Sequence, residues 1–193
     1  IFSRAFCNYV FPRPEIKRPM PDKDGNDETT QELTAIADED LLDAGVHLDN
    51  VDGRYEADEL DDESMLNNDE AKSYDERIKS ALRMLNDRKK EFLSLDALST
   101  YSPKFKKMLE NIKSDKNSGL HLVYSQFRTL EGIGIFKLVL EANGFAEFKI
   151  KQVGGTWRVD MPREDMGKPT FVLYTGTESS EQKEIVRNIF NGD

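Results

Sequence analysis

Residues 74–94, YDERIKSALRMLNDRKKEFLS, repeat apolar side chains every three or four positions, with charged side chains between them. The apolar positions are Ile78, Leu82, Leu85 and Phe92. This spacing places them on one face and predicts an amphipathic helix. Residues 102–114, SPKFKKMLENIKS, predict a second helix, because Pro103 directly after Ser102 is a favourable helix start. Its expected apolar face consists of Phe105, Met108, Leu109 and Ile112.

The pattern changes after residue 119. The short apolar run LHLVYS (120–125) predicts a buried strand. The next stretch, TLEGIGIFKLVLEANGF (129–145), predicts a helix that ends at Asn143 and Gly144. The inward side chains of that helix are expected to be Ile133, Phe136, Val139 and Leu140.

The last third of the chain continues the alternation. Residues 148–162, FKIKQVGGTWRVDMP, alternate around Gly154 and Gly155 and predict a β-hairpin. TFVLYTG (170–176) predicts a second apolar strand, and TESSEQKEIVRNIF (177–190) predicts a helix. Ser179 and Gln182 have the spacing of a capping box at the start of that helix.

Apolar strands that alternate with helices indicate an α/β fold with a parallel sheet flanked by helices. Ligands of such sheets bind at the carboxyl ends of the strands. The polar stretches SQFR (125–128) and YTGTE (174–178) both fall at such ends, so this edge is the expected binding site.

The first 73 residues differ from the rest. Residues 1–21 are rich in aromatic residues and proline and predict an irregular segment that packs on a larger body. Residues 22–73 are acidic and poor in aromatics, which predicts a disordered insert. Residues 74–193 are the predicted folded lobe. Because the chain lacks an initiator methionine and ends at FNGD without an obvious stop, we expect a fragment of a larger protein, truncated at the C-terminal end of the lobe.

The net charge of −10 is unevenly distributed. Residues 22–76 contain 21 acidic and 3 basic residues, a balance of −18, whereas the remainder has a balance of +8. The negative total argues against nucleic acid as a partner, but the basic body argues for it. The single cysteine, Cys7, excludes a disulfide framework and favours a reducing, intracellular setting.

The turn at Ser125, Gln126, Phe127 and Arg128 offers a hydroxyl, an amide and a guanidinium at a strand-to-helix junction. These groups suit phosphate oxygens. The alternative is that Ser125 only caps a helix, that Phe127 belongs to the core and that Arg128 is a solvated charge.

The turn at Thr175, Gly176 and Thr177 allows close backbone approach to a ligand before a helix N-terminus. Its alternative is capping by Thr177. The two histidines, His47 and His121, have no ligand partners at metal spacing, so no metal site is expected. Trp157 is expected to pack on the hairpin or to contact a partner.

An ordered set of these motifs resembles the second RecA-like lobe of superfamily-two helicases, with the Swi/Snf-like branch closest. The matching pieces are a Ser-x-Lys helix, a strand ending in Ser-Gln-Phe, a Gly-Thr turn and a helix ending in Phe-Asn. They occur here at Ser102/Lys104, 125–127, 176–177 and 190–191, and the resemblance covers roughly residues 101–193. The opening stretch, SRAFCNYVFPRPEIKRP, is similar to a segment in helicases of large DNA viruses.

The resemblance implies an ATP-dependent helicase or translocase that tracks on nucleic acid, with DNA favoured over RNA, in a viral factory or virion. It implies that five residues face the phosphate backbone: Ser125, Gln126, Arg128, Gly176 and Thr177. Phe127 would support the turn.

This chain departs from the complete family pattern in two respects. It lacks the first lobe, which would bind ATP and Mg²⁺ through a Walker motif, so the chain alone is expected not to hydrolyse ATP. The hairpin at 148–168 is an insertion relative to the minimal lobe. The alternative function is a non-catalytic α/β interaction module whose acidic segment binds a partner.

Overall fold

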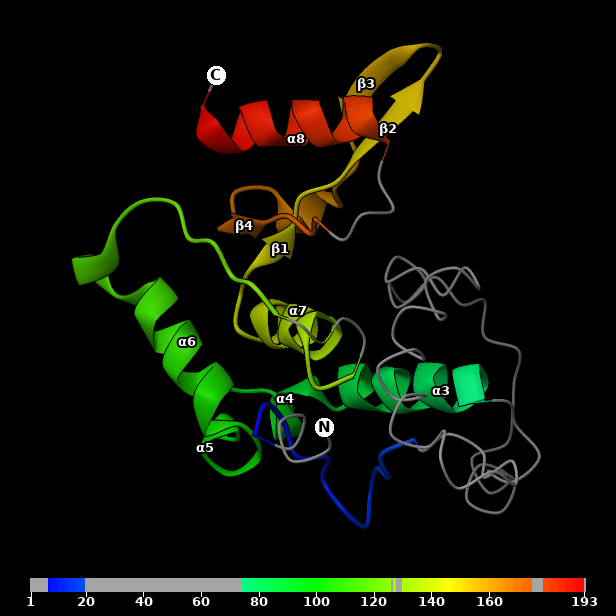
Figure 1. Cartoon of the computed structure of the whole chain (residues 1–193), viewed down its shortest axis with the longest axis vertical. Helices are drawn as coiled ribbons and strands as arrows, with labels where there is room; N and C mark the ends of the chain where they lie inside the picture. The colour runs from blue at the N-terminus through cyan, green and yellow to red at the C-terminus, as the bar shows by residue number, and fades with distance from the viewer. Residues whose placement is uncertain (1–6, 20–73, 126, 128–129, 175–178, 193) are drawn as a thin grey trace, which may run out of the picture.

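The computed structural model describes residues 7–19, 74–125, 127, 130–174 and 179–192. Helices α3 to α7 form one end of the molecule, and α8 lies beside a β-hairpin at the other end, with a small parallel sheet between them (Figure 1). The helices are α3 (Tyr74–Asp87), α4 (Lys89–Phe92), α5 (Leu98–Tyr101), α6 (Pro103–Lys113), α7 (Ile133–Ala142) and α8 (Ser180–Asn191). The other elements are η3 (Asp115–Asn117), β1 (Ala146–Glu147), β2 (Ile150–Val153), β3 (Thr156–Val159), η4 (Arg163–Asp165) and β4 (Thr170–Phe171).

The helix predicted over residues 74–94 is present as two helices, α3 and α4. The break falls at Arg88, whose backbone is not helical (φ −105°, ψ 27°). All four side chains of the predicted apolar face are buried, so the amphipathic pattern is confirmed: Ile78, Leu82, Leu85 and Phe92.

Helix α6 confirms the second predicted helix and its start. The Ser102 hydroxyl accepts a hydrogen bond from the Phe105 amide (3.1 Å), and Pro103 occupies the first turn. Such a cap satisfies an amide that has no partner within the helix. Phe105 and Leu109 are buried, and Phe105 packs against Phe136 of α7 with the ring centroids 5.0 Å apart.

Helix α7 is at the centre of the core and is buried on all sides, from Gly134 to Leu140. Its predicted stop is confirmed, because Asn143 caps it and Gly144 has a positive φ of 94°. The Asn143 side-chain amide also donates to the carbonyl of Leu93 (2.8 Å), which links the end of α7 to the end of α4. Lys137 is 1% exposed and forms an ion pair with Glu147 of β1 (2.8 Å), as a charge at that depth requires.

The strand prediction is confirmed only in part. β1 pairs with β4 in parallel, with Ala146 opposite Thr170, and β2 pairs with β3 as the predicted hairpin. Gly154 and Gly155 form its turn at φ 59° and 79°, a conformation that favours glycine. The structure is therefore α/β in the broad sense, with a small parallel sheet and flanking helices.

The buried strand predicted at residues 120–125 is wrong. This stretch is extended, but within the described part of the chain it pairs with no strand. Leu122 and Tyr124 are 93% and 88% exposed. An apolar run indicates that a segment favours burial. A β-strand also needs a neighbouring strand to pair its backbone hydrogen-bonding groups. Of the described residues of the second predicted strand, only Thr170 and Phe171 are paired.

Residues 7–19 pack against the helices as an irregular segment. Tyr9, Phe11 and Ile16 are all at most 5% exposed and join the same core as α3, α6 and α7. The Val10 amide donates to the Tyr101 carbonyl (2.8 Å) at the end of α5. The segment therefore contributes side chains to the core itself.

Replacing Tyr9 by phenylalanine is expected to leave the free energy of unfolding unchanged or to raise it by about 1 kcal/mol. The ring is fully buried, and its hydroxyl has no hydrogen-bond partner among the described residues. Burial raises the pKa of this hydroxyl, so it remains protonated at neutral pH. Urea unfolding of both proteins measures the effect. A loss of more than about 1 kcal/mol would show that the hydroxyl is hydrogen-bonded.

Candidate nucleic-acid interface

Of the five residues predicted to contact phosphate, the structure describes Ser125. Gln126, Arg128, Gly176 and Thr177 lie outside the described residues. Ser125 and Phe127 define the course of the first turn, and the second predicted turn, residues 175–177, lies outside the described residues. The arrangement of all five side chains around a ligand stays a prediction.

The turn at residues 125–127 is closed by one side chain on a neighbouring backbone. The Ser125 hydroxyl accepts a hydrogen bond from the Phe127 amide (3.1 Å) and donates one to the Phe127 carbonyl (2.9 Å). A serine that bonds to the backbone two residues ahead fixes a tight local turn. The hydroxyl of Ser125 therefore organises the turn in this structure.

The same turn is held against the start of α7. The Ile133 amide donates to the Phe127 carbonyl (3.1 Å). Gly132 lies so close that a Cβ atom there would be 1.9 Å from that carbonyl oxygen. Only glycine fits this approach. The predicted helix at 129–145 consequently begins four residues late, at Ile133.

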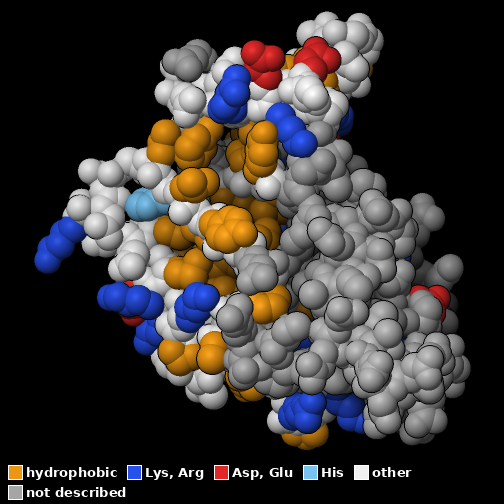
Figure 2. Space-filling model, in the orientation of Figure 1, with side chains coloured by type: hydrophobic (Ala, Val, Ile, Leu, Met, Phe, Trp, Pro, Cys, Tyr) orange, Lys and Arg blue, Asp and Glu red, His pale blue; other side chains and the backbone are white. Residues whose placement is uncertain are grey.

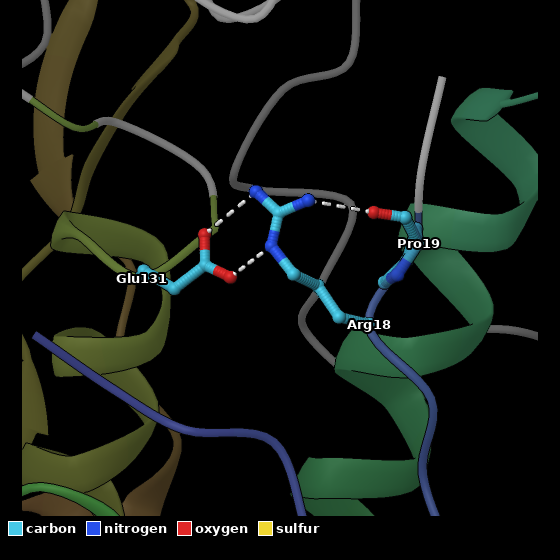
Figure 3. A network of polar contacts seen from close by, with 3 residues as sticks. All are labelled: Arg18, Pro19 and Glu131. Carbon is cyan, nitrogen blue, oxygen red and sulfur yellow. Dashed lines mark hydrogen bonds and ion pairs between the residues drawn. The ribbon is translucent and has the colours of Figure 1, made fainter. Parts of the chain in front are cut away.

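Glu131 supports the loop between the turn and α7. It is 1% exposed and has a positive φ of 45°, which is uncommon for any residue but glycine. Its carboxylate accepts two hydrogen bonds from the guanidinium of Arg18, one from Nε and one from Nη2 (3.1 Å) (Figure 3). Burial raises the pKa of the Glu131 carboxyl, and the hydrogen bonds and charge of Arg18 oppose this rise.

Ser102 and Lys104, the Ser-x-Lys pair of the sequence motif, contact the N-terminal segment. The Ser102 hydroxyl donates to the Asn8 carbonyl, and the Lys104 ammonium donates to the Asn8 side-chain oxygen (2.6 Å). Both motif residues therefore hold Asn8 in place.

The helix after the second predicted turn has the expected cap. The Ser179 hydroxyl accepts a hydrogen bond from the Gln182 amide (3.2 Å), at the start of α8. Trp157 of the hairpin donates to the Glu181 carboxylate (2.9 Å), so its indole links β3 to α8.

Hydrophobic side chains gather across the middle of one face of the molecule, with lysine and arginine side chains around them (Figure 2). The exposed large apolar residues of the described chain include Leu120, Leu122, Tyr124 and Tyr174. Leu120, Leu122 and Tyr124 precede the 125–127 turn, and Tyr174 precedes the second predicted turn.

No metal site emerges from the parts of the chain that the structure describes. They hold no cluster of three or more histidine, cysteine or acidic side chains arranged to bind an ion.

None of the helices in the described parts of the chain combines the length and the apolar character needed to cross a lipid bilayer.

Sequence reasoning missed Arg18, Glu131 and Asn8. A weak signal existed for Glu131, since it is an isolated acidic residue before a glycine in an apolar stretch. Arg18 had no local signal, because its partner lies 113 residues away.

A comparison with known proteins finds a similarity to a viral protein. No family model matches this chain, and no solved structure matches it. A stretch of 113 residues, 58% of the chain, is 31% identical to a protein of Acanthamoeba polyphaga mimivirus named "Putative ATP-dependent RNA helicase". The matched stretch covers 17% of that protein, so this chain corresponds to a small part of its length. Over the matched residues, the chain is similar to this viral protein.

Proposed function

We propose that this chain is part of an ATP-dependent helicase or translocase and that residues 74–193 belong to its second, RecA-like lobe of the Swi/Snf-like type. In this proposal the lobe grips the phosphate backbone of the tracked strand. The relationship to a helicase over 113 residues supports the activity class. The observation that carries the site is the Ser125–Phe127 turn, which is fixed by its own hydrogen bonds directly before α7.

The grip combines this turn with the four predicted residues outside the described chain: Gln126, Arg128, Gly176 and Thr177. Backbone amides, hydroxyls and one guanidinium hold phosphate without reading sequence. The relative is named an RNA helicase, whereas the motif resemblance favours DNA, so binding is tested with both a DNA and an RNA oligonucleotide.

ATP and Mg²⁺ are bound mainly by another lobe of the parent protein. Closure of two lobes around ATP would then advance the strand.

Domain organisation follows the same proposal. Residues 1–21 serve the lobe as a segment that packs on it, and residues 22–73 are an acidic insert between that segment and the lobe. The packing of Tyr9, Phe11 and Ile16 into the core supports the role of the first segment.

Replacing Arg128 by alanine is expected to weaken binding of fluorescent 20-nucleotide DNA or RNA and to reduce its salt dependence. Loss of one phosphate contact lowers the slope of log K against log salt by about 0.7 for a single strand. Fluorescence anisotropy between low and high salt measures both quantities. The control is Arg83→Ala, because Arg83 is an exposed arginine on α3 that pairs with Asp87.

The result has two clear readings. A slope that falls with Arg128→Ala and stays unchanged with Arg83→Ala supports the phosphate grip. A wild-type chain without salt-dependent binding to either probe contradicts it and favours the non-catalytic interaction module.

A further inference from the structure

We propose that Arg18 is a positioning residue for the Ser125–Phe127 turn and acts on it through Glu131. The N-terminal segment would thereby set the geometry of the phosphate grip without contacting nucleic acid. The link to the grip rests on the proposed function, whereas the link to the turn rests on the structure alone.

Among the described residues, Arg18 holds the carboxylate of Glu131 through its guanidinium. Its side chain is 7% exposed and that of Glu131 is 1% exposed, so water reaches neither freely. The guanidinium directs two nitrogens at the carboxylate and the third at the Pro19 carbonyl (2.9 Å) (Figure 3). A bidentate pair of this kind fixes orientation as well as distance. These three bonds are all made within the chain, so the donors that form them are not available to a phosphate backbone.

The hold on Glu131 reaches the turn through backbone contacts. Glu131 has a positive φ, a conformation that persists only where its surroundings impose it. Gly132, the next residue, contacts the Phe127 carbonyl more closely than any side chain would allow. The Ile133 amide donates to that same carbonyl. A displaced Glu131 therefore changes the position of the Phe127 backbone.

The other end of the segment is also attached to a motif-bearing element. Asn8 is held by Ser102 and Lys104 at the start of α6. Between these two attachments, Tyr9, Phe11 and Ile16 are buried in the core. The segment thus spans from the Ser102–Lys104 motif to the loop behind the turn, and it fixes one relative to the other.

Amide hydrogen exchange of the whole chain tests the link to the turn without nucleic acid. In Arg18→Lys, which keeps the charge and loses the bidentate fork, the Ile133 amide is expected to exchange about tenfold faster. The Leu138 and Leu140 amides, deeper in α7, are expected to change by less than about threefold. The control is Ile16→Val, which loosens packing of the same segment and leaves the ion pair in place.

Two outcomes overturn the positioning role. One is an unchanged exchange rate of the Ile133 amide in Arg18→Lys, and the other is a rise of the ratio of Ile133 to Leu140 exchange in Ile16→Val that equals the rise in Arg18→Lys. If Arg18→Lys speeds the exchange of all amides equally, the milder variant Glu131→Gln tests whether the ion pair positions the turn. A selective rise at Ile133 in that variant supports the role, and a uniform rise assigns the pair to general core stability instead.

Binding of the 20-nucleotide probes tests the link to the grip. Arg18→Lys is expected to weaken binding several-fold, because it loosens the hold on Glu131 and keeps the charge. The double variant Arg18→Met with Glu131→Gln removes the guanidinium without leaving a buried carboxylate, and its salt slope is expected to equal that of the wild type, because Arg18 meets no phosphate. A reduced slope would mean direct contact and overturn the proposal, as would full affinity despite faster Ile133 exchange. Failure of the wild type to bind refutes the proposed function alone, and the exchange result still decides whether Arg18 positions the turn.

Discussion

Replacing Gly132 by alanine is expected to reduce the free energy of unfolding by about 3 kcal/mol, at the upper end of the usual cost of overpacking. The added Cβ would be 1.9 Å from the Phe127 oxygen and 2.4 Å from its carbonyl carbon. Both atoms are backbone, so no side-chain rotation relieves the clash. The turn must move away from α7, which breaks the hydrogen bond between Ile133 and Phe127.

Urea unfolding followed by circular dichroism measures this effect, and Gly144→Ala is the matched control. Gly144 has a φ of 94°, and a Cβ atom added there would meet nothing within 4 Å, so its substitution carries only the conformational cost, about 1 kcal/mol. Equal losses in the two variants would show that the turn shifts at no cost. A greater loss at Gly132 identifies the close approach as the cause.

Replacing Arg18 by methionine is expected to destabilise the fold by about 3–5 kcal/mol at pH 7.5, because it leaves the buried Glu131 carboxylate without its partner. The cost should shrink as the pH falls toward 5. Burial already raises the pKa of Glu131 in the wild type, and without Arg18 the pKa rises further. A carboxyl whose folded pKa exceeds its unfolded pKa favours the folded state most at low pH, and this benefit is lost as the pH rises through the folded pKa.

Chemical unfolding of the wild type and of Arg18→Met at several pH values measures this difference. The control is the double variant Arg18→Met with Glu131→Gln, in which residue 131 no longer titrates. The difference between Arg18→Met and this control should be greatest at pH 7.5 and small at pH 5. A difference that is constant over this range would contradict the titration of Glu131.

Elements with local signals were predictable from sequence. Helix α6 follows from Ser102, Pro103 and an apolar face, all within one short stretch. The hairpin follows from two glycines between alternating residues, and the end of α7 follows from Asn143 and Gly144. In each case the residues that decide the structure are neighbours in the chain, so their preferences are readable without the fold.

Features that depend on distant partners were not predictable. The late start of α7 is set by Gly132 against Phe127 and by Glu131 against Arg18, and the second contact crosses 113 residues. Leu120 and Leu122 formed a plausible strand, but periodicity carries no information about a neighbouring strand. For the candidate site, the sequence identified Ser125 as a turn residue but gave only a weak signal for Glu131, whose carboxylate supports the loop behind the turn, and none for its partner Arg18.

The central position of α7 has a consequence for how the chain folds as it is synthesised. Residues 7–19 and α3 bury their apolar side chains in a core that includes α7, so they have no complete surface to pack on until that helix emerges from the ribosome. The separation of 113 residues between Arg18 and Glu131 corresponds to roughly 6–23 s at about 5–20 residues per second. During this interval Tyr9, Phe11 and Ile16 are exposed, and this segment of the nascent chain is a candidate client for chaperones that bind apolar segments.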